Sequence, residues 1–109
     1  MIEIEAVLDE NGVLKTCTAS GHAGAGKTGF DIVCAAVSVL MRTAVRSLSG
    51  RKGITIRCGA PEPGFLSLET GYTEEGREFL SAAGVFLTEG LASVVEEYPK
   101  HCKLTIRRT

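Results

Sequence analysis

Cys34, Asp31 and His22 are the residues of this chain whose types and spacing best support covalent chemistry. The run Asp31-Ile32-Val33-Cys34 predicts the start of a helix, with Asp31 at the N-cap, where its carboxylate accepts the backbone amide three positions on. Cys34 would then lie in the first helical turn, where unpaired amides and the helix dipole favour a negatively charged sulfur. The pattern therefore predicts a nucleophilic thiolate at a helix start.

His22 is the residue best placed to serve as the base for that thiol. It stands at the end of a predicted strand, and the glycine-rich segment between it and Cys34 can bring the two side chains together. An adjacent imidazole is a common way to activate a cysteine nucleophile. Non-catalytic, structural roles also remain possible for all three residues: Cys34 as a small core residue, His22 as a loop histidine bonded to backbone, and Asp31 as a helix cap alone.

The remaining cysteines and the second histidine lack this setting. Cys17, Cys58 and Cys102 fall on predicted strands, where a neutral buried thiol is the ordinary outcome. His101 is adjacent to Cys102, and neighbouring residues of a strand point to opposite faces. Because no C-x-x-C pair occurs, we expect free thiols and no metal site.

A second chemistry competes for the glycine-rich segment. Residues 21–28 match the phosphate-loop pattern G-x-x-x-x-G-K-[ST], in which Lys27 would reach phosphates and Thr28 would hold magnesium. The preceding residues 14–20 alternate polar and apolar, unlike a buried parallel strand, and Gly29 separates the pattern from the expected helix. Nucleotide binding is therefore the weaker alternative.

Hydrophobic periodicity predicts five strands and two helices that would position these residues. Residues 30–48 read as a helix that should be extensively buried, and residues 73–98 read as a helix whose apolar set, including Phe79, Phe86 and Leu87, faces a sheet. The predicted strands cover residues 2–8, 13–20, 54–58, 65–69 and 102–107. The fold class is α+β in the order ββαββαβ, with two helices packed on a mostly antiparallel five-stranded sheet.

Length and composition limit the classes of protein. The 109 residues fit a single domain over residues 1–109, and 44% of them are hydrophobic, as in globular proteins. Twelve basic and thirteen acidic residues leave no electrostatic footprint for direct nucleic-acid binding. No uninterrupted apolar run approaches the roughly twenty residues of a membrane span, and the acidic start is unlike a signal peptide. We expect a cytoplasmic protein without a membrane partner.

Gly21-His22-Ala23, then Gly29, then Asp31-Ile32-Val33-Cys34-Ala35 form a pattern that resembles the ribosomal-processing cysteine proteases of bacteria, called Prp. The similarity is sharpest over residues 21–38. The length and the order of the elements agree with that family over the whole chain.

The resemblance implies a His-Cys endopeptidase that removes the N-terminal extension of protein twenty-seven of the large ribosomal subunit, cutting after an aromatic residue. It implies His22 as base and Cys34 as nucleophile, with Asp31 and Gly21 in support, no cofactor, and a homodimer. The loop that would close over the substrate peptide contains Ala23, Gly24, Gly26 and Gly29.

This loop departs from the family pattern. Residues 24–28 are small and basic, where other members often carry polar or acidic residues. The alternative from a different class is a non-catalytic ribosome-associated module, in which the same loop grips a peptide without cleaving it.

Overall fold

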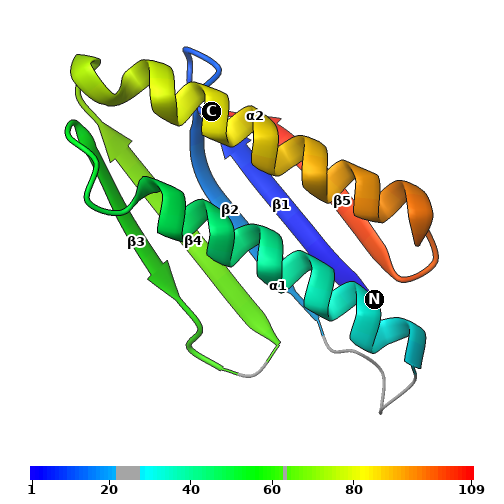
Figure 1. Ribbon diagram of the computed structural model, residues 1–109. Coiled ribbons are helices and arrows are strands. Elements are labelled where there is room, and N and C mark those ends of the chain that lie inside the picture. Colours follow the sequence, from blue (N-terminus) through cyan, green and yellow to red (C-terminus); the bar gives the residue numbers. More distant parts are fainter. Residues whose placement is uncertain (22–27, 63) are drawn as a thin grey trace.

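The computed structural model describes residues 1–21, 28–62 and 64–109, with the side chains of residues 28–31 left out. Figure 1 shows seven elements in the order ββαββαβ, as predicted. The strands are β1 (Ile2–Leu8), β2 (Leu14–Ser20), β3 (Ile54–Gly59), β4 (Phe65–Tyr72) and β5 (Cys102–Arg108), and the helices are α1 (Thr28–Leu48) and α2 (Glu74–Glu97).

The strands form one mixed sheet in the order β3-β4-β2-β1-β5. The pairs β1–β2, β2–β4 and β3–β4 are antiparallel, which confirms both predicted hairpins. Only β5 runs parallel to its neighbour, β1. The α2 connection makes this parallel pairing possible, because a parallel return requires a crossover rather than a tight turn.

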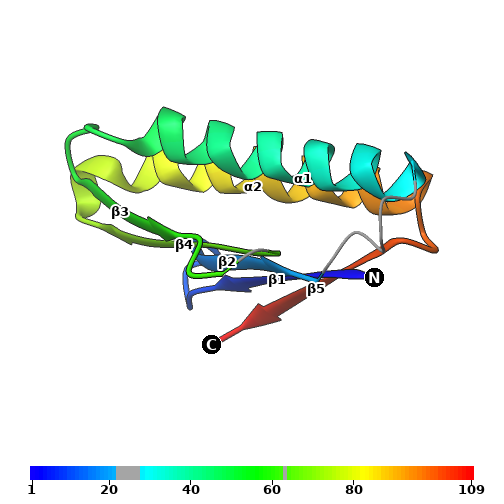
Figure 2. The ribbon, with the colours of Figure 1, turned by 90° about the horizontal axis from the view of Figure 1, so that it is seen from below.

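Both helices lie on the same face of the sheet (Figure 2). Alternation places one side of each strand under them: in β1, Ile2, Ile4 and Ala6 are buried, whereas Glu3 is exposed. In Figure 1, α1 lies over the β3–β4 side and α2 over the β1–β5 side. The main apolar core fills the space between the helices and the strands.

The first helix is amphipathic rather than extensively buried, so that prediction is wrong. Val33, Val37 and Met41 face the core and are at most 3% exposed, but Ile32 and Val39 are each 51% exposed. The two-layer architecture explains the difference, because a helix on one face of a sheet has only one side to bury.

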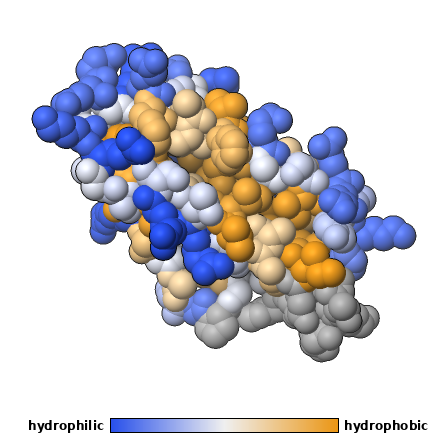
Figure 3. Space-filling view, in the orientation of Figure 1, coloured by the Kyte–Doolittle hydropathy of each residue, from blue (hydrophilic) through white to orange (hydrophobic). Residues whose placement is uncertain are grey.

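The second helix follows the predicted range and turns only part of the predicted apolar set inward. Leu87 and Leu91 are buried as predicted, together with Leu80, whereas Phe86 is 75% exposed and Phe79 is 39% exposed. The expectation that both phenylalanines face the sheet is therefore wrong. Figure 3 shows the apolar band that such side chains form on the outer surface of the helical layer.

By length and composition alone, α2 is apolar enough to cross a membrane, which the uninterrupted apolar runs of the sequence did not indicate. A core helix of a globular protein meets the same criterion but is mostly buried, whereas 28% of this apolar stretch is buried. One side of α2 nevertheless packs closely on the sheet: a Cβ placed at the buried Gly84 would lie 2.9 Å from the Cβ of Leu14 on β2.

Candidate active site

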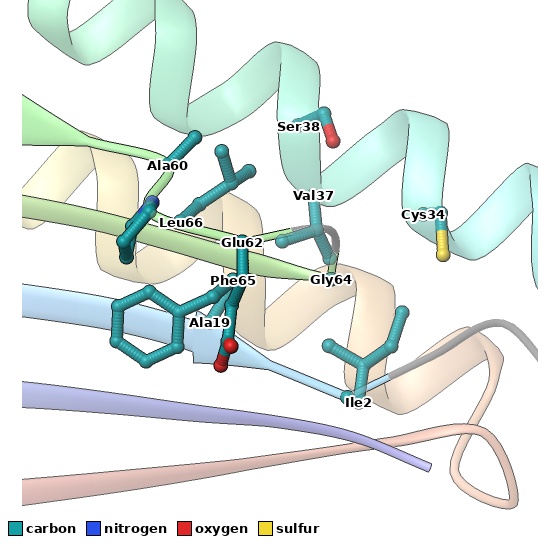
Figure 4. Close-up of a pocket in the computed structure, with 12 residues that line it drawn as sticks. Ile2, Ala19, Cys34, Val37, Ser38, Ala60, Glu62, Gly64, Phe65 and Leu66 are labelled. Atoms are coloured by element: carbon teal, nitrogen blue, oxygen red, sulfur yellow. The ribbon is translucent and has the colours of Figure 1, made fainter.

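Cys34 lines a cavity of about 490 Å³ between α1 and the sheet. Its sulfur is directed from the helix toward the strands, as Figure 4 shows. The walls are mainly apolar and come from α1, β1, β2 and the β3–β4 hairpin. They consist of Ile2, Ala19, Gly21, Cys34, Val37, Ser38, Ala60, Pro61, Glu62, Gly64, Phe65 and Leu66. Small binding sites are usually apolar clefts with a few polar groups. The half-buried thiol of Cys34 lies in a cleft of this kind.

Helical periodicity places three residues of α1 at this cavity. Val37 and Ser38 follow Cys34 by three and four positions, so they lie on the same side of the helix. Val37 is buried and anchors the helix on the sheet, while Ser38 is half-buried and offers a hydroxyl to the cavity. The thiol and this hydroxyl are one turn apart.

Gly21 brings the residue before His22 to the same cavity. It follows β2 directly, has a φ of 120°, and donates its N–H to the carbonyl oxygen of Gly64 at 3.0 Å. A Cβ here would overlap the backbone oxygen of Met1. This position therefore needs glycine for both its backbone conformation and its space. The chain enters the segment of His22 beside the cavity that holds Cys34.

His22 itself and the predicted loop residues Ala23, Gly24 and Gly26 lie outside the described residues. The proximity of His22 and Cys34 therefore stays a prediction. The position of Gly21 supports it, because adjacent Cα atoms are only about 3.8 Å apart.

The start of α1 corrects the predicted N-cap. The helix begins at Thr28, so the backbones of Gly29 and Asp31 are already helical. Gly29 is thus not a loop residue, and Asp31 is not the cap. Cys34 lies beyond the first turn, where the pattern of helical hydrogen bonds engages its amide and the dipole acts more weakly. The sequence pattern did not indicate this start because a glycine-rich stretch is typical of a loop.

The same helix start bears on the phosphate-loop alternative. The predicted separation of that pattern from the helix by Gly29 is wrong, because α1 begins at Thr28. The strand before the pattern, however, runs antiparallel to both of its neighbours, β1 and β4. Phosphate loops follow a strand of a parallel β-α unit, so this sheet does not provide their usual setting.

The other thiols differ from Cys34 in their surroundings. Burial raises the pKa of Cys17 to about 12 and also raises the pKa of Cys102, so both are neutral core residues. Cys58 is exposed on β3, so the expectation of a buried thiol is wrong at this position. Cys34 alone among the four lines the cavity beside Gly21. In the described part of the chain, no three His, Cys, Asp or Glu side chains gather as metal ligands.

The comparison with known proteins decides the family. The family model described as cysteine protease Prp matches residues 1–103. This chain belongs to the cysteine protease Prp family. It is thus a cysteine protease, and the resemblance seen around Cys34 is confirmed. No curated protein sequence matches the chain significantly.

Solved structures agree with the Prp fold. The SMU.848 protein from Streptococcus mutans is 28% identical, with a TM-score of 0.85 over 100% of this chain and 96% of that one. The ribosomal processing protease Prp from S. aureus, solved in complex with a substrate peptide, is 20% identical, with a TM-score of 0.81. That match covers 97% of this chain and 99% of the S. aureus chain. A second S. aureus Prp structure carries a covalently linked product peptide and has a TM-score of 0.80 at 20% identity, with the same coverage of both chains.

The far wall of the cavity was missed by reasoning from the sequence. Ala60, Pro61 and Phe65 come from the β3–β4 hairpin, which was predicted only as a turn between two strands. The available signal was the density of turn residues from Pro61 to Gly64, since binding residues are often carried on loops held by a rigid scaffold.

Proposed function

We propose that this protein is an endopeptidase that removes the N-terminal extension of protein twenty-seven of the large ribosomal subunit, with Cys34 as nucleophile and His22 as base. The observation that carries the proposal is the apolar cavity at which the Cys34 sulfur and the backbone beside His22 meet. Membership of the Prp family and the ribosomal processing role of the S. aureus relative support it.

The cavity suits the side chain of an aromatic residue before the scissile bond. Its volume of about 490 Å³ and its lining by Val37, Phe65 and Leu66 provide an apolar surface for a ring. A buried aromatic side chain contributes a large apolar area. Leu66 presents its side chain to the face of the sheet that α1 covers, whereas Figure 4 shows the Phe65 ring on the side of β4 away from α1, so Val37 and Leu66 would make the apolar contacts with the substrate ring.

The proposed mechanism has two steps. His22 takes the proton of Cys34, the thiolate attacks the scissile carbonyl carbon, and the imidazolium protonates the leaving amine as the peptide bond breaks. Water, deprotonated by His22, then attacks the thioester, which releases the extension as a carboxylic acid and restores the thiol. Proton transfer of this kind contributes about 100-fold to 10,000-fold in rate.

The amide of Cys34 is already used in the hydrogen-bond pattern of the helix. The oxyanion of each tetrahedral intermediate therefore needs other hydrogen-bond donors. In a helix that begins at Thr28, the first turn carries the unpaired N–H groups, so we assign the oxyanion donors to the backbone of residues 28–31. In enzymes of known mechanism, removing one such donor costs about 3 kcal/mol of transition-state stabilisation.

The test is cleavage of a full-length ribosomal-protein precursor, with the new N-terminus read by mass spectrometry. Wild type and a His101→Ala control, which changes the other histidine outside the cavity, should release the extension after an aromatic residue, and Cys34→Ala and His22→Ala should not. Cleavage by Cys34→Ala at the wild-type rate would refute the assignment. Binding of the precursor by every variant without cleavage would favour the peptide-binding module instead.

The assembly and location of the protein are also proposals. The family resemblance implies a homodimer, which sedimentation of the wild-type protein at several concentrations would test. We also propose a cytoplasmic location, and the near-balanced charge favours a protein that does not bind nucleic acid directly.

A further inference from the structure

We propose that Arg42 and Arg46 form a specificity site for a carboxylate side chain of the substrate, four or five residues from the scissile bond. The inference rests on the proposed protease function of Cys34 and extends it. It starts from a second cavity that adjoins the first.

This second cavity has a volume of about 650 Å³ and lies between α1 and the β3–β4 hairpin. It shares Ala60 and Leu66 with the cavity of Cys34, so the two form one groove along the helix. Arg42, Val45 and Arg46 line its helical side, and Cys58 and Leu68 line its strand side. The groove is long enough to hold several residues of an extended peptide.

The charge of the groove changes along its length. Arg42 and Arg46 are the only charged side chains among the described residues that line the second cavity. Neither makes an ion pair with a carboxylate in the described part of the chain, whose salt bridges involve Arg57, Arg77 and Arg107. Two guanidinium groups without a carboxylate partner, on an otherwise apolar wall, complement an acidic side chain.

The two arginines belong to the same ridge of α1 as the nucleophile. Cys34, Ser38, Arg42 and Arg46 follow one another at intervals of four, which places them along one row of the helix. The Nε of Arg42 donates to the carbonyl oxygen of Ser38 at 3.3 Å. This bond holds the side chain back along the helix and leaves its terminal nitrogens for a ligand.

Helical and extended geometry give the position of the acidic residue. At about 1.5 Å per residue, Arg42 and Arg46 lie about 12 Å and 18 Å along the helix from Cys34. An extended peptide advances about 3.3 Å per residue, so these distances correspond to about four or five residues from the scissile bond.

The alternative is that the arginines only stabilise the helix. Arg46 stands in the last turn of α1, where a basic residue stabilises the helix dipole. That role would affect the stability of the protein but not its choice between a charged and a neutral substrate. The measurement must therefore be a ratio between two substrates.

The experiment uses peptides with the cleavable segment, each carrying Glu or its neutral isostere Gln at one position from the second to the seventh on either side of the bond. For wild type, we expect kcat/KM to favour Glu over Gln by about twofold to fivefold at the fourth or fifth position, since exposed ion pairs are weak. The preference should fall at high ionic strength.

The variant Arg42→Gln/Arg46→Gln should lose this preference and keep its activity on the Gln peptides. The control Arg57→Gln/Arg108→Gln removes the same charge outside both cavities and should retain the preference. Equal rates for Glu and Gln at every position, or a preference that survives in Arg42→Gln/Arg46→Gln, would overturn the inference while leaving the protease function intact.

If no peptide is cleaved, the result counts against the proposed function. The carboxylate site is then tested by a binding measurement. The same peptides, labelled with a fluorophore, are then titrated with Cys34→Ala protein. Tighter binding of the Glu peptide than of the Gln peptide supports the carboxylate site if this difference is lost when Arg42 and Arg46 are both replaced by Gln. Equal affinities for the two peptides overturn it.

Discussion

The backbone N–H of Gly21 donates to the carbonyl oxygen of Gly64 at 3.0 Å and thereby joins the end of β2 to the β3–β4 hairpin. Both glycines line the cavity of Cys34. One bond therefore connects the strand that leads to His22 with the hairpin that forms the far wall of the site. The geometry of the cavity depends on this link.

Gly21→Ala should destabilise the protein and lower its activity. Alanine is strained at a φ of 120°, and its Cβ would overlap the backbone oxygen of Met1. We expect a loss of more than about 3 kcal/mol in the free energy of unfolding, since backbone strain alone costs about 1–3 kcal/mol. Denaturant titration measures it.

Gly50→Ala is the matched control for that change. Gly50 has a φ of 76° but nothing within 4 Å of its Cβ position. It should lose only the strain component, about 1 kcal/mol, and retain proteolysis. Equal losses for the two variants would show that the close approach to Met1 has no effect.

The four cysteines should differ in alkylation by iodoacetamide at neutral pH. Cys17 and Cys102 should react only after unfolding, because burial raises the pKa of each thiol and excludes the reagent. With His22 as the proposed base, Cys34 should react faster than the more exposed Cys58, because a base that takes the proton of a thiol makes its sulfur a better nucleophile. Peptide mapping by mass spectrometry gives each rate.

His22→Ala should remove the advantage of Cys34 over Cys58 in this measurement. Cys58 serves as the internal standard because the substitution leaves its exposure on β3 unchanged. An advantage of Cys34 that persists in His22→Ala would argue against His22 as the base.

Phe86 and Leu87 are adjacent in the sequence but should differ sharply in their effect on stability. Leu87 is 2% exposed, so Leu87→Ala should cost about 2–5 kcal/mol of the free energy of unfolding. Phe86 is 75% exposed, so Phe86→Ala should change it by less than about 0.5 kcal/mol. The reverse order in thermal or chemical denaturation would contradict the orientation of α2.

The Tyr72–Asp9 contact should make stability depend on pH. The Tyr72 hydroxyl donates to the Asp9 carboxylate at 2.5 Å and, with the amides of Val13 and Asn11, lowers the pKa of Asp9 below 3.8. A carboxyl whose pKa is lowered by folding stabilises the folded state when the pH is above the pKa of the unfolded state. This contribution is lost as the pH falls through the pKa of the folded state.

Tyr72→Phe should therefore cost about 1 kcal/mol in unfolding free energy at pH 7, and the cost should shrink below pH 3.8. Tyr98→Phe is the control: Tyr98 is half-buried against the core, and within the described residues the hydrogen bond from a tyrosine hydroxyl to a carboxylate is that of Tyr72. A cost for Tyr72→Phe that is the same at pH 3 and pH 7 would show that Asp9 is not coupled to this hydroxyl.

Most of the fold could be predicted from the sequence because the strands alternate cleanly. The pattern of Ile2, Ile4 and Ala6 against Glu3 defines a buried and an exposed side, and the turn at Asn11-Gly12 gives the pairing. Helix faces were less predictable. Val39 and Phe86 are apolar but exposed, and hydrophobicity alone does not indicate which side of an apolar helix meets the sheet.

The candidate site was predictable in its local motif and not in its tertiary parts. Cys34 and Gly21 were identified from their neighbours in the sequence, and the structure places both at one cavity. The hairpin residues Ala60 and Phe65 reach that cavity through the β2–β4 pairing, which is a long-range contact with no local signature. The same holds for the groove that continues to Arg42.

The most direct test of the central claim, that the Cys34 sulfur is the nucleophile, is active-site labelling with a peptide chloromethyl ketone that ends in an aromatic residue. The account predicts a single adduct on Cys34 that forms in step with the loss of proteolysis, with Cys58 unmodified. Loss of proteolysis through an adduct on another residue, or full activity in protein labelled at Cys34, would contradict it.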